Sequence, residues 1–292
     1  MSNEGQSPNF IPIINRGFES SISPYLTTSD DRLVEYGFKE VLFDQTSPYQ
    51  RVQIVKTVDH GNMLILDGAV NLAENDTVPY THALMNIPQD EHLYNHSNVL
   101  ILGGGDGGLL KSILELSQKP KQVTMVDLDE MVVKACSQFM PKTCGKYMNE
   151  EGSNYKVIIG DALGFMSDKH ESKIEYDIIF GDLTDVPVDS DDLDTTKTHS
   201  ISSPTQEAWT FIAKVLKLAF SILKPNTGKY FTHCNGKSVP MVLKQYEQLL
   251  EEIRIDKGGK IYKPKWTQAE SFVPSFMETW MFYQVSLVEI DI

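Results

Sequence analysis

Four aspartates follow short apolar segments of the chain, each at a place where a strand of a parallel sheet would end. They are Asp106, Asp127, Asp161 and Asp182, and they follow the segments 99–102, 122–126, 155–159 and 176–180. In an open parallel sheet the carboxyl ends of the strands share one edge, and ligands bind in the crevice beyond that edge. The spacing therefore predicts an edge lined with carboxylates, which favours positively charged ligands.

The first of these aspartates lies inside a glycine-rich turn, residues 103–108, between an apolar segment and a predicted helix. Glycines such as Gly103 and Gly105 allow the backbone to turn tightly and a ligand to approach closely. A dinucleotide would place its pyrophosphate where the charge of Asp106 repels it. An adenosyl ligand that carries positive charge, such as a sulfonium with an ammonium tail, is the better match. Asp127, about 20 residues further on, has the spacing of an acid that binds a ribose.

The same aspartates allow a second interpretation, because aspartate is a favoured residue at the start of a helix. All four could be helix caps, and Asp106 could merely cap the helix after the glycines. We favour the ligand site, because capping does not explain an aspartate within the glycine turn. Nor does it explain why Asp182 precedes a long acidic loop, residues 185–205, in place of a helix. That loop is either a lid over the site or a solvated insertion.

Three further side chains are candidates for the same site. Residues 76–79 predict the start of a helix that places Tyr80 in its first turn, where the ring either packs or takes part in catalysis. Gln50, at the beginning of a predicted strand, either contacts a ligand or ends the strand pairing. Glu278 lies in an otherwise apolar strand, so it is a candidate ligand for an amine unless it is satisfied in another way.

The composition is that of an acidic globular chain of 292 residues, with 23% charged and 41% hydrophobic residues. The net charge of −14 argues against nucleic acid or an anionic membrane as a partner. We expect a cytoplasmic protein, because the sequence contains neither a signal-peptide pattern nor a run of about 18 apolar residues. The three cysteines and seven histidines show no metal-ligand spacing, so we expect reduced thiols and no metal.

The predicted elements divide the chain into three parts. Residues 1–29, rich in Ser, Asn and Pro, are expected to form a flexible tail. Residues 30–92 predict a small N-terminal antiparallel β unit, whose third strand is expected at 62–73, and a linking helix. From 93 to 292 strands alternate with helices, which indicates an α/β domain built on a Rossmann-like, doubly wound sheet.

Several motifs, taken together, resemble the aminopropyltransferases that make polyamines, the spermidine and spermine synthases. The motifs are Ser47-Pro48-Tyr49-Gln50, Leu66-Asp67-Gly68, residues 103–108 with Asp106, Asp127-Leu128-Asp129 and Gly160-Asp161. The resemblance covers residues 33–288, and the segments 182–187 and 274–280 are more similar to animal spermine synthases than to spermidine synthases. We therefore expect the chain to correspond to an animal spermine synthase without its N-terminal domain.

The resemblance implies a class I methyltransferase-type domain that binds decarboxylated S-adenosylmethionine as co-substrate, without a metal. The implied donor-binding residues are Gln50, Gly103, Gly105, Asp106, Asp127, Asp161 and Ala162, with Asp127 on the ribose and Asp161 near the adenine. Tyr80 and Asp182 match the family's catalytic pair, and together with Asp185 and Glu278 they are the implied polyamine contacts. Asp182 is then expected to take a proton from the attacking amine before methylthioadenosine leaves. The family also implies a homodimer.

Three residues depart from the pattern that the resemblance implies. Ala69 stands where spermine synthases tend to carry an aspartate, Phe276 where a tyrosine is usual, and Thr81 where spermidine synthases commonly have glutamine. Spermidine is the favoured acceptor, and putrescine or another amine stays open. One alternative is an amine N-methyltransferase, although Asp106 would oppose the carboxylate of intact S-adenosylmethionine. The other is a catalytically silent polyamine-binding protein, because a shared fold does not guarantee a shared activity.

Overall fold

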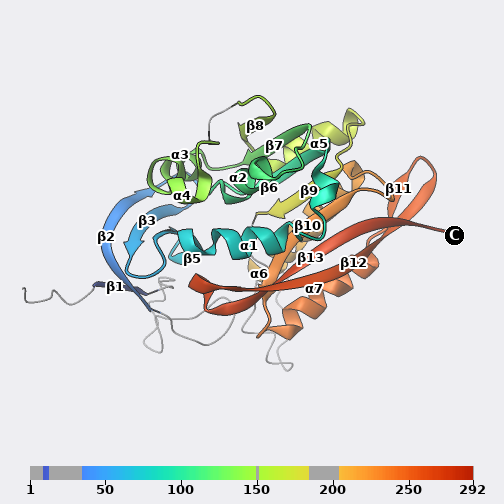
Figure 1. The fold of residues 1–292 in the computed structure, drawn as a ribbon. Coiled ribbons are helices and arrows are strands. Elements are labelled where there is room, and N and C mark those ends of the chain that lie inside the picture. The colour runs from blue at the N-terminus through green and yellow to red at the C-terminus, as the bar shows by residue number, and fades with distance from the viewer. Residues whose placement is uncertain (1–8, 13–34, 149–150, 184–203, 292) are drawn as a thin grey trace, which may run out of the picture.

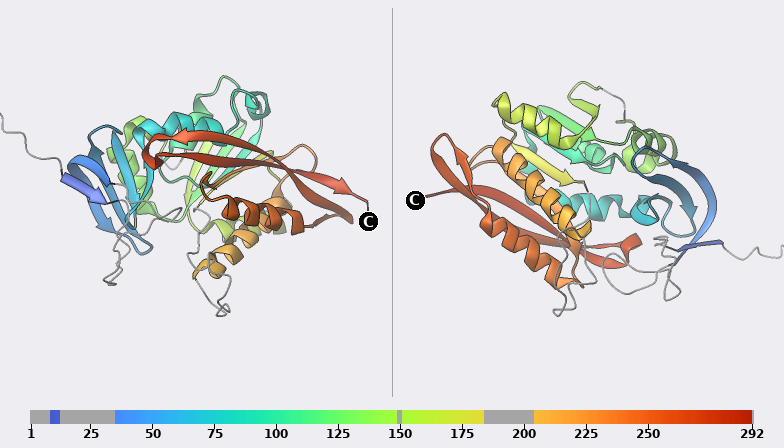
Figure 2. Two further views of the ribbon diagram at one scale, coloured as in Figure 1. Left: turned by 90° about the horizontal axis from the view of Figure 1, so that it is seen from below. Right: turned by 180° about the vertical axis from the view of Figure 1, so that it is seen from behind.

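The computed structural model describes residues 9–12, 35–148, 151–183 and 204–291, and it contains two β-sheets (Figure 1). The five-stranded N-terminal sheet has the order β1-β2-β3-β4-β5. The eight-stranded sheet has the order β11-β12-β13-β10-β9-β6-β7-β8. Two further views show the small sheet at one end of the molecule and the large sheet between layers of helices (Figure 2).

The N-terminal sheet confirms the predicted antiparallel β unit. Its strands are β1 (Asn9–Pro12), β2 (Glu35–Thr46), β3 (Arg51–Thr57), β4 (Asn62–Leu66) and β5 (Ala69–Ala73). The single strand predicted at 62–73 is wrong, because Asp67 and Gly68, with φ of 49° and 84°, form a turn between β4 and β5. Strand β1, within the expected tail, pairs with β2. The division into residues 1–29, 30–92 and 93–292 stays a prediction.

The large sheet confirms the predicted Rossmann-like α/β domain. Its strands are β6 (Asn98–Gly103), β7 (Gln122–Asp127), β8 (Tyr155–Ile159), β9 (Ile178–Asp182), β10 (Lys229–Gly236), β11 (Ile255–Lys257), β12 (Lys260–Val273) and β13 (Glu278–Ile290). The five neighbours β8, β7, β6, β9 and β10 run parallel, and β13 pairs antiparallel with β10. The carboxyl ends of the five parallel strands therefore share one edge.

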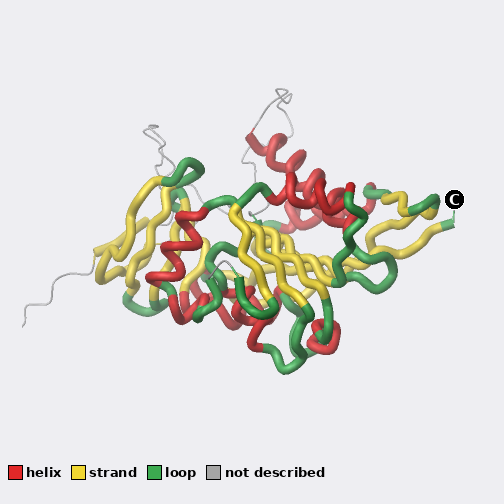
Figure 3. Tube along the Cα trace, turned by 90° about the horizontal axis from the view of Figure 1, so that it is seen from above, coloured by secondary structure: helices red, strands yellow, loops and turns green. Residues whose placement is uncertain are grey.

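Helices cover both faces of this sheet, as the secondary-structure view also shows (Figure 3). They are α1 (Thr77–Leu84), α2 (Gly108–Glu115), α3 (Glu130–Phe139), α4 (Pro141–Cys144), α5 (Ala162–Glu171), α6 (Pro204–Ile222) and α7 (Pro240–Glu252), with 3-10 turns η1 (Glu74–Asp76), η2 (Glu91–Tyr94) and η4 (Pro274–Phe276). No helix within the described residues has both the length and the apolarity that crossing a bilayer requires.

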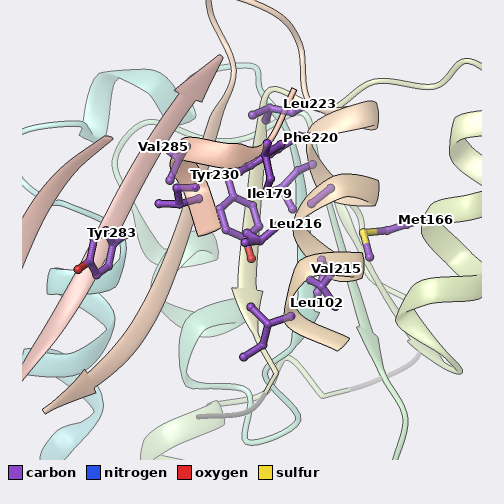
Figure 4. Close-up of a cluster of buried hydrophobic side chains, with 14 of the residues drawn as sticks. Leu102, Met166, Ile179, Val215, Leu216, Phe220, Leu223, Tyr230, Tyr283 and Val285 are labelled. Carbon is purple, nitrogen blue, oxygen red and sulfur yellow. The ribbon is translucent and has the colours of Figure 1, made fainter. Parts of the chain in front are cut away.

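The two helical layers pack on alternate side chains of the same strands. On one face Leu102 of β6 joins Val215 and Leu216 of α6 in a buried cluster (Figure 4). On the other face Ile101 joins Ile113 of α2. Because successive side chains of a strand point to opposite faces, a strand covered on both sides must be apolar at every position. The continuous apolar segments in the sequence are therefore the central strands of the sheet.

Strands β12 and β13 form a long hairpin whose turn reaches the N-terminal sheet. The sequence predicts short strands at 260–262 and 277–285, and the structure corrects both to 14 and 13 residues. Along β12 many side chains are polar and exposed, so the segment lacks the apolar run that marks a buried strand. Pairing with β13 over its whole length, from Ile261 with Ile290 to Val273 with Glu278, is what holds it as a strand.

A buried carboxylate, that of Asp76, connects the hairpin turn to the start of α1. Its side chain is fully buried and accepts hydrogen bonds from Ala73 N at 2.6 Å and Ser275 N at 2.8 Å. The Ser275 hydroxyl also donates to Asp76, and the Tyr36 hydroxyl of β2 donates to Ser275 O. Asp76 lies at the predicted start of the helix, but its carboxylate makes no capping hydrogen bond to α1. It joins three separate elements through hydrogen bonds that the local sequence does not reveal.

Replacement of Asp76 by alanine is expected to lower the free energy of unfolding by about 2 to 4 kcal/mol. Two buried backbone N–H groups, of Ala73 and Ser275, would lose their acceptor. Urea unfolding monitored by circular dichroism measures this loss. Asp59→Ala is the control, because the side chain of Asp59 is exposed. A loss for Asp76→Ala as small as that of the control would show that water replaces these bonds.

Candidate active site

The strand order reverses between β6 and β9, and we call the sheet edge at the carboxyl ends of these two strands the crevice. From β6 the chain moves outward to β7 and β8 and then returns to β9 on the opposite side of β6. Such a reversal of strand order leaves a gap at the carboxyl ends of the two central strands, where ligands bind in doubly wound sheets. Gly103, the last residue of β6, stands in register with Asp182, the last residue of β9. The glycine turn and Asp182 therefore meet at the centre of the sheet edge.

The glycines of the turn allow the chain to approach itself. Gly103 has a φ of +82°, and a Cβ there would lie 2.0 Å from Asp182 O. Gly104 N donates to the same oxygen at 3.1 Å. A Cβ on Gly105 would lie 2.6 Å from Asp127 Oδ2. The turn is thus fixed against the backbone of Asp182 and the side chain of Asp127, a function of these glycines that the sequence pattern did not specify.

Asp106 lies within the glycine turn, near the carboxylates of Asp127 and Asp182. Its Oδ1 accepts a hydrogen bond from Gly108 N, the first residue of α2, at 2.7 Å, but the N-cap residue of this helix is Gly107 and not Asp106. Burial, together with the negative charges of Asp182 and Asp127, raises the pKa of Asp106 to about 7, against the opposing effect of the Gly108 N–H. A cation that binds here would relieve the repulsion among these three carboxylates. The sequence predicts such a preference for positively charged ligands.

Asp127 and Gln50 reach the same edge through a shared partner, Asp129. Asp127 Oδ1 accepts from Asp129 N at 2.8 Å, and burial raises the pKa of Asp127 despite its hydrogen bonds to the N–H groups of Asp129 and Gly105. The carboxylate of Asp129 accepts from Gln50 Nε2 at 3.2 Å and from Ser47 Oγ at 2.6 Å. Asp129 therefore connects the N-terminal sheet to the ligand edge of the large sheet. Asp129 lies in the same motif as Asp127, but the motif does not indicate this contact between the two sheets.

Asp161 follows β8 and is separated from β6 by β7. Its carboxylate accepts hydrogen bonds from Leu163 N at 3.0 Å and Gly164 N at 2.9 Å, and it caps helix α5. The capping interpretation therefore applies to this aspartate. The neighbouring Ala162 is buried at the start of the helix. Both residues lie on the sheet edge, further from the crevice than Asp127.

Tyr80 and Asp182 form a hydrogen-bonded pair of chemically active side chains at the crevice. The Tyr80 hydroxyl donates to Asp182 Oδ1 at 2.9 Å. Helix α1 positions the tyrosine, whose ring packs edge-on against Phe276 and Phe282 with centroid distances of 6.4 and 5.3 Å. Burial raises the pKa of the Asp182 carboxyl, while the charge of His233 and the Tyr80 hydrogen bond lower it. A buried acid held in this way is suited to accept a proton.

His233 was missed by the sequence analysis. Its Nε2 lies 3.9 Å from Asp182 Oδ1, and its side chain is 6% exposed. The histidine follows the apolar pair Tyr230 and Phe231, and β10 continues beyond it to Gly236, which brings the histidine to the crevice. The available signal was the polar residue directly after an apolar strand that neighbours β9.

Glu278 is buried at the start of β13, next to the end of β10. Its Oε1 accepts from Ser238 N at 2.8 Å, and a Cβ on Gly236 would lie 2.4 Å from its carboxyl carbon. The residue is thus partly satisfied by backbone. Phe276 lies between Tyr80 and Trp280, with ring centroids 6.4 and 4.8 Å away.

The remaining candidates lie elsewhere. Ala69 begins β5, where it pairs with Leu66. Asp185 and the loop up to residue 203 lie outside the described residues. In the described part of the chain, no group of three or more His, Cys, Asp or Glu side chains could hold a metal ion.

Fold and crevice together define a Rossmann-like, class I methyltransferase-type protein with an acidic ligand edge. Residues 77–289 match the family model described as the spermine/spermidine synthase domain, and residues 25–74 match the spermidine synthase tetramerisation domain. The chain belongs to the spermine/spermidine synthase family.

Curated relatives agree with this assignment. A polyamine aminopropyltransferase of Clostridium tetani is 36% identical over 158 residues, which are 53% of each chain. One of Methanocaldococcus jannaschii is 34% identical over 147 residues, 50% of this chain and 47% of the relative. The matched region thus spans about half the length of these curated relatives.

Two solved structures show the fold at low sequence identity. Spermidine synthase from Thermotoga maritima has a TM-score of 0.67 at 17% identity, covering 98% of this chain and 82% of that one. A spermidine synthase in complex with the transition state analogue AdoDATO has a TM-score of 0.66, also at 17% identity, covering 98% and 83%.

Proposed function

We propose that this protein transfers the aminopropyl group of decarboxylated S-adenosylmethionine to an amine of a polyamine and releases methylthioadenosine. The observation that carries the proposal is the 2.9 Å pair of Tyr80 and Asp182 beside Asp106, at the point where the strand order reverses. Family membership supports it, and so do the relatives named polyamine aminopropyltransferases. The spermidine synthase bound to a transition state analogue has the same fold.

The donor is assigned to the side of the crevice formed by β6, β7 and β8. Decarboxylated S-adenosylmethionine carries a sulfonium and an ammonium and lacks the carboxylate that Asp106 would repel. The proposed donor-binding residues are Gln50, Gly103, Gly105, Asp106, Asp127, Asp161 and Ala162. In this arrangement Asp127 binds the ribose, Asp161 lies near the adenine, and Gln50 reaches the ligand from its position on Asp129.

The reaction needs a base, because an alkylammonium with a pKa near ~10 is protonated in neutral water and has no free electron pair. In the proposed mechanism Asp182 takes the proton, and Tyr80 holds the carboxylate in place. The freed electron pair of the amine nitrogen then attacks the aminopropyl carbon attached to sulfur. A C–N bond forms as the C–S bond breaks, and the bonding electrons remain on sulfur as a neutral thioether. Glu278 and Asp185 are the proposed contacts for the remaining ammonium groups.

Spermidine is the proposed acceptor, with spermine as product. The segments 182–187 and 274–280 support this choice through their similarity to animal spermine synthases, whereas Ala69 and Phe276 remove polar groups found there. A homodimer and a cytoplasmic location are further proposals, and the match to a tetramerisation domain supports self-association.

Product analysis tests the function. Decarboxylated S-adenosylmethionine and the intact compound are each supplied with putrescine, spermidine and spermine, and the products are identified by mass spectrometry. We expect spermidine to gain an aminopropyl group, with one methylthioadenosine released for each product molecule. Methyl transfer from the intact donor alone would identify an N-methyltransferase. Polyamine binding without any product would identify a silent binding protein.

Donor affinity is expected to depend on pH through Asp106. The pKa of its carboxyl is raised to about 7, and only the ionised form attracts the cationic donor. Affinity should therefore fall as the pH drops through 7, by about tenfold per pH unit once the group is mostly protonated. Calorimetric titration with decarboxylated S-adenosylmethionine across this range measures the slope, which Asp106→Asn should flatten. An equal slope in both proteins would assign the dependence to another group.

A further inference from the structure

We propose that His233 makes acceptor binding sensitive to pH: once protonated, its imidazolium competes with the ammonium of the polyamine for the carboxylate of Asp182. The inference rests on the aminopropyl transfer proposed above, and it assigns a positioning role to a residue outside the donor and acceptor contacts already named.

The geometry places the imidazole beside the proposed base without bonding it directly. His233 Nε2 lies 3.9 Å from Asp182 Oδ1, a distance within ion-pair range and longer than a hydrogen bond. The two side chains therefore interact mainly through charge, which His233 carries only when it is protonated. The imidazole ring lies 6.1 Å from the ring of Tyr80. His233 thus faces the same Asp182 oxygen that accepts the tyrosine hydrogen bond.

The groups around His233 and its burial strengthen the effect of a positive charge on its imidazole. The titratable groups near this end of β10, on the described elements packed against it, are Asp182 on β9, Tyr80 on α1, Glu278 on β13 and Tyr246 on α7. Each is either an acid or a phenol. The side chains of His233 and Asp182 are 6% and 10% exposed, so water screens the pair only weakly. A protonated imidazole therefore adds a cation at the place where the acceptor must bring its own.

Protonation of His233 and binding of the polyamine ammonium at Asp182 oppose each other. A protonated His233 and an ionised Asp182 carry opposite charges 3.9 Å apart and attract each other, and the charge of His233 accordingly lowers the pKa of Asp182 against the effect of burial. An ammonium group that binds Asp182 must compete with the imidazolium of His233 for the carboxylate. The two positive charges also repel each other. Histidine is the side chain that ordinarily changes charge between about pH 5 and 8. Acceptor affinity should therefore fall on the acid side of neutrality and recover on the alkaline side.

The test compares spermidine affinity at two pH values in matched variants. Calorimetry with spermidine as titrant is performed at about pH 6 and pH 8 on the native protein, on His233→Gln and on His82→Gln. His82 is an exposed histidine on α1, so its replacement controls for the loss of a histidine away from the crevice. Asp106 also changes charge near pH 7, so the comparison is between proteins: we expect the fall in affinity from the higher to the lower pH to be about tenfold larger in the native and His82 proteins than in His233→Gln.

A second variant keeps the test decisive. His233→Lys carries its charge at both pH values, so it should bind spermidine weakly at both. A His233→Gln protein that retains the full native pH dependence, or a His233→Lys protein that binds like the native one, would overturn the inference. These results differ from failure of the proposed function, which would appear as a native protein that makes no aminopropylated product under any condition. Such a native protein would overturn both.

Discussion

Asp182→Asn is expected to reduce kcat by about 10²- to 10⁴-fold, the range that a positioned general base contributes. The amide is close in size and can still accept the Tyr80 hydrogen bond, but it cannot take a proton from the attacking ammonium. Donor affinity should be retained or improved, because the charge of Asp182 contributes to the raised pKa of Asp106. Release of methylthioadenosine, measured at saturating donor and acceptor, gives kcat.

The control for this variant is Asp168→Asn, which makes the same chemical change at an exposed position on α5. It should leave kcat unchanged. If Asp182→Asn retained more than about a tenth of the native kcat, proton removal by this residue would not limit the reaction. The base would then have to be water or another acid of the crevice.

Gly103→Ala is expected to cause a large loss of stability. Its φ of +82° is strained for alanine, by about 1 to 2 kcal/mol, and the new methyl group would lie 2.0 Å from Asp182 O. Relief of that clash must move the backbone of Asp182, so activity should fall together with stability. We expect a loss of about 3 kcal/mol or more in the free energy of unfolding, measured by urea denaturation.

Gly160→Ala is the matched control, because a Cβ at Gly160 meets nothing within 4 Å and the residue has no positive φ. It should change the free energy of unfolding by less than about 0.5 kcal/mol and leave activity intact. A Gly103→Ala protein as stable and active as the Gly160 variant would show that the turn adapts easily. Asp182 would then not depend on the turn for its position.

The central strands were predictable because burial on two faces leaves a continuous apolar segment in the sequence. Strand β8 occupies the predicted residues 155–159, and β6 leads into the glycine turn and helix α2 as expected. The alternation of strands and helices fixes the topology, and the topology brings Asp106, Asp127 and Asp182 to one edge. This much of the site follows from local patterns combined with one rule about parallel sheets.

The contacts between distant segments were not predictable in the same way. Asp76 binds Ser275, which is 199 positions away in the chain, and neither residue lies in a pattern that distinguishes it from an ordinary polar residue. His233 escaped because polar residues commonly end a strand, whereas here the strand continues on the crevice side. Only the first residues of β12 were predicted, because its exposed polar face has no apolar run that would indicate the rest of the strand.

The capping alternative illustrates how one residue type serves two purposes. Asp161 caps α5 with both oxygens, and Asp106 bonds Gly108 N at the start of α2. Sequence alone could not separate capping from ligand binding, because both place an aspartate between a strand and a helix. The two roles are distinguished by the surrounding residues. The charges of Asp182 and Asp127 repel that of Asp106, whereas Asp161 follows β8, a strand further from the centre of the sheet.

The donor preference of the native chain tests most directly whether the acidic crevice is built for a cationic aminopropyl donor. Calorimetric affinities for decarboxylated and intact S-adenosylmethionine are compared in the native protein and in Asp106→Asn. We expect the native protein to prefer the decarboxylated donor by about 10²-fold, since the extra carboxylate meets Asp106, and the variant to lose most of that preference. Equal affinity for both compounds, or tighter binding of the intact one, would contradict the proposed function.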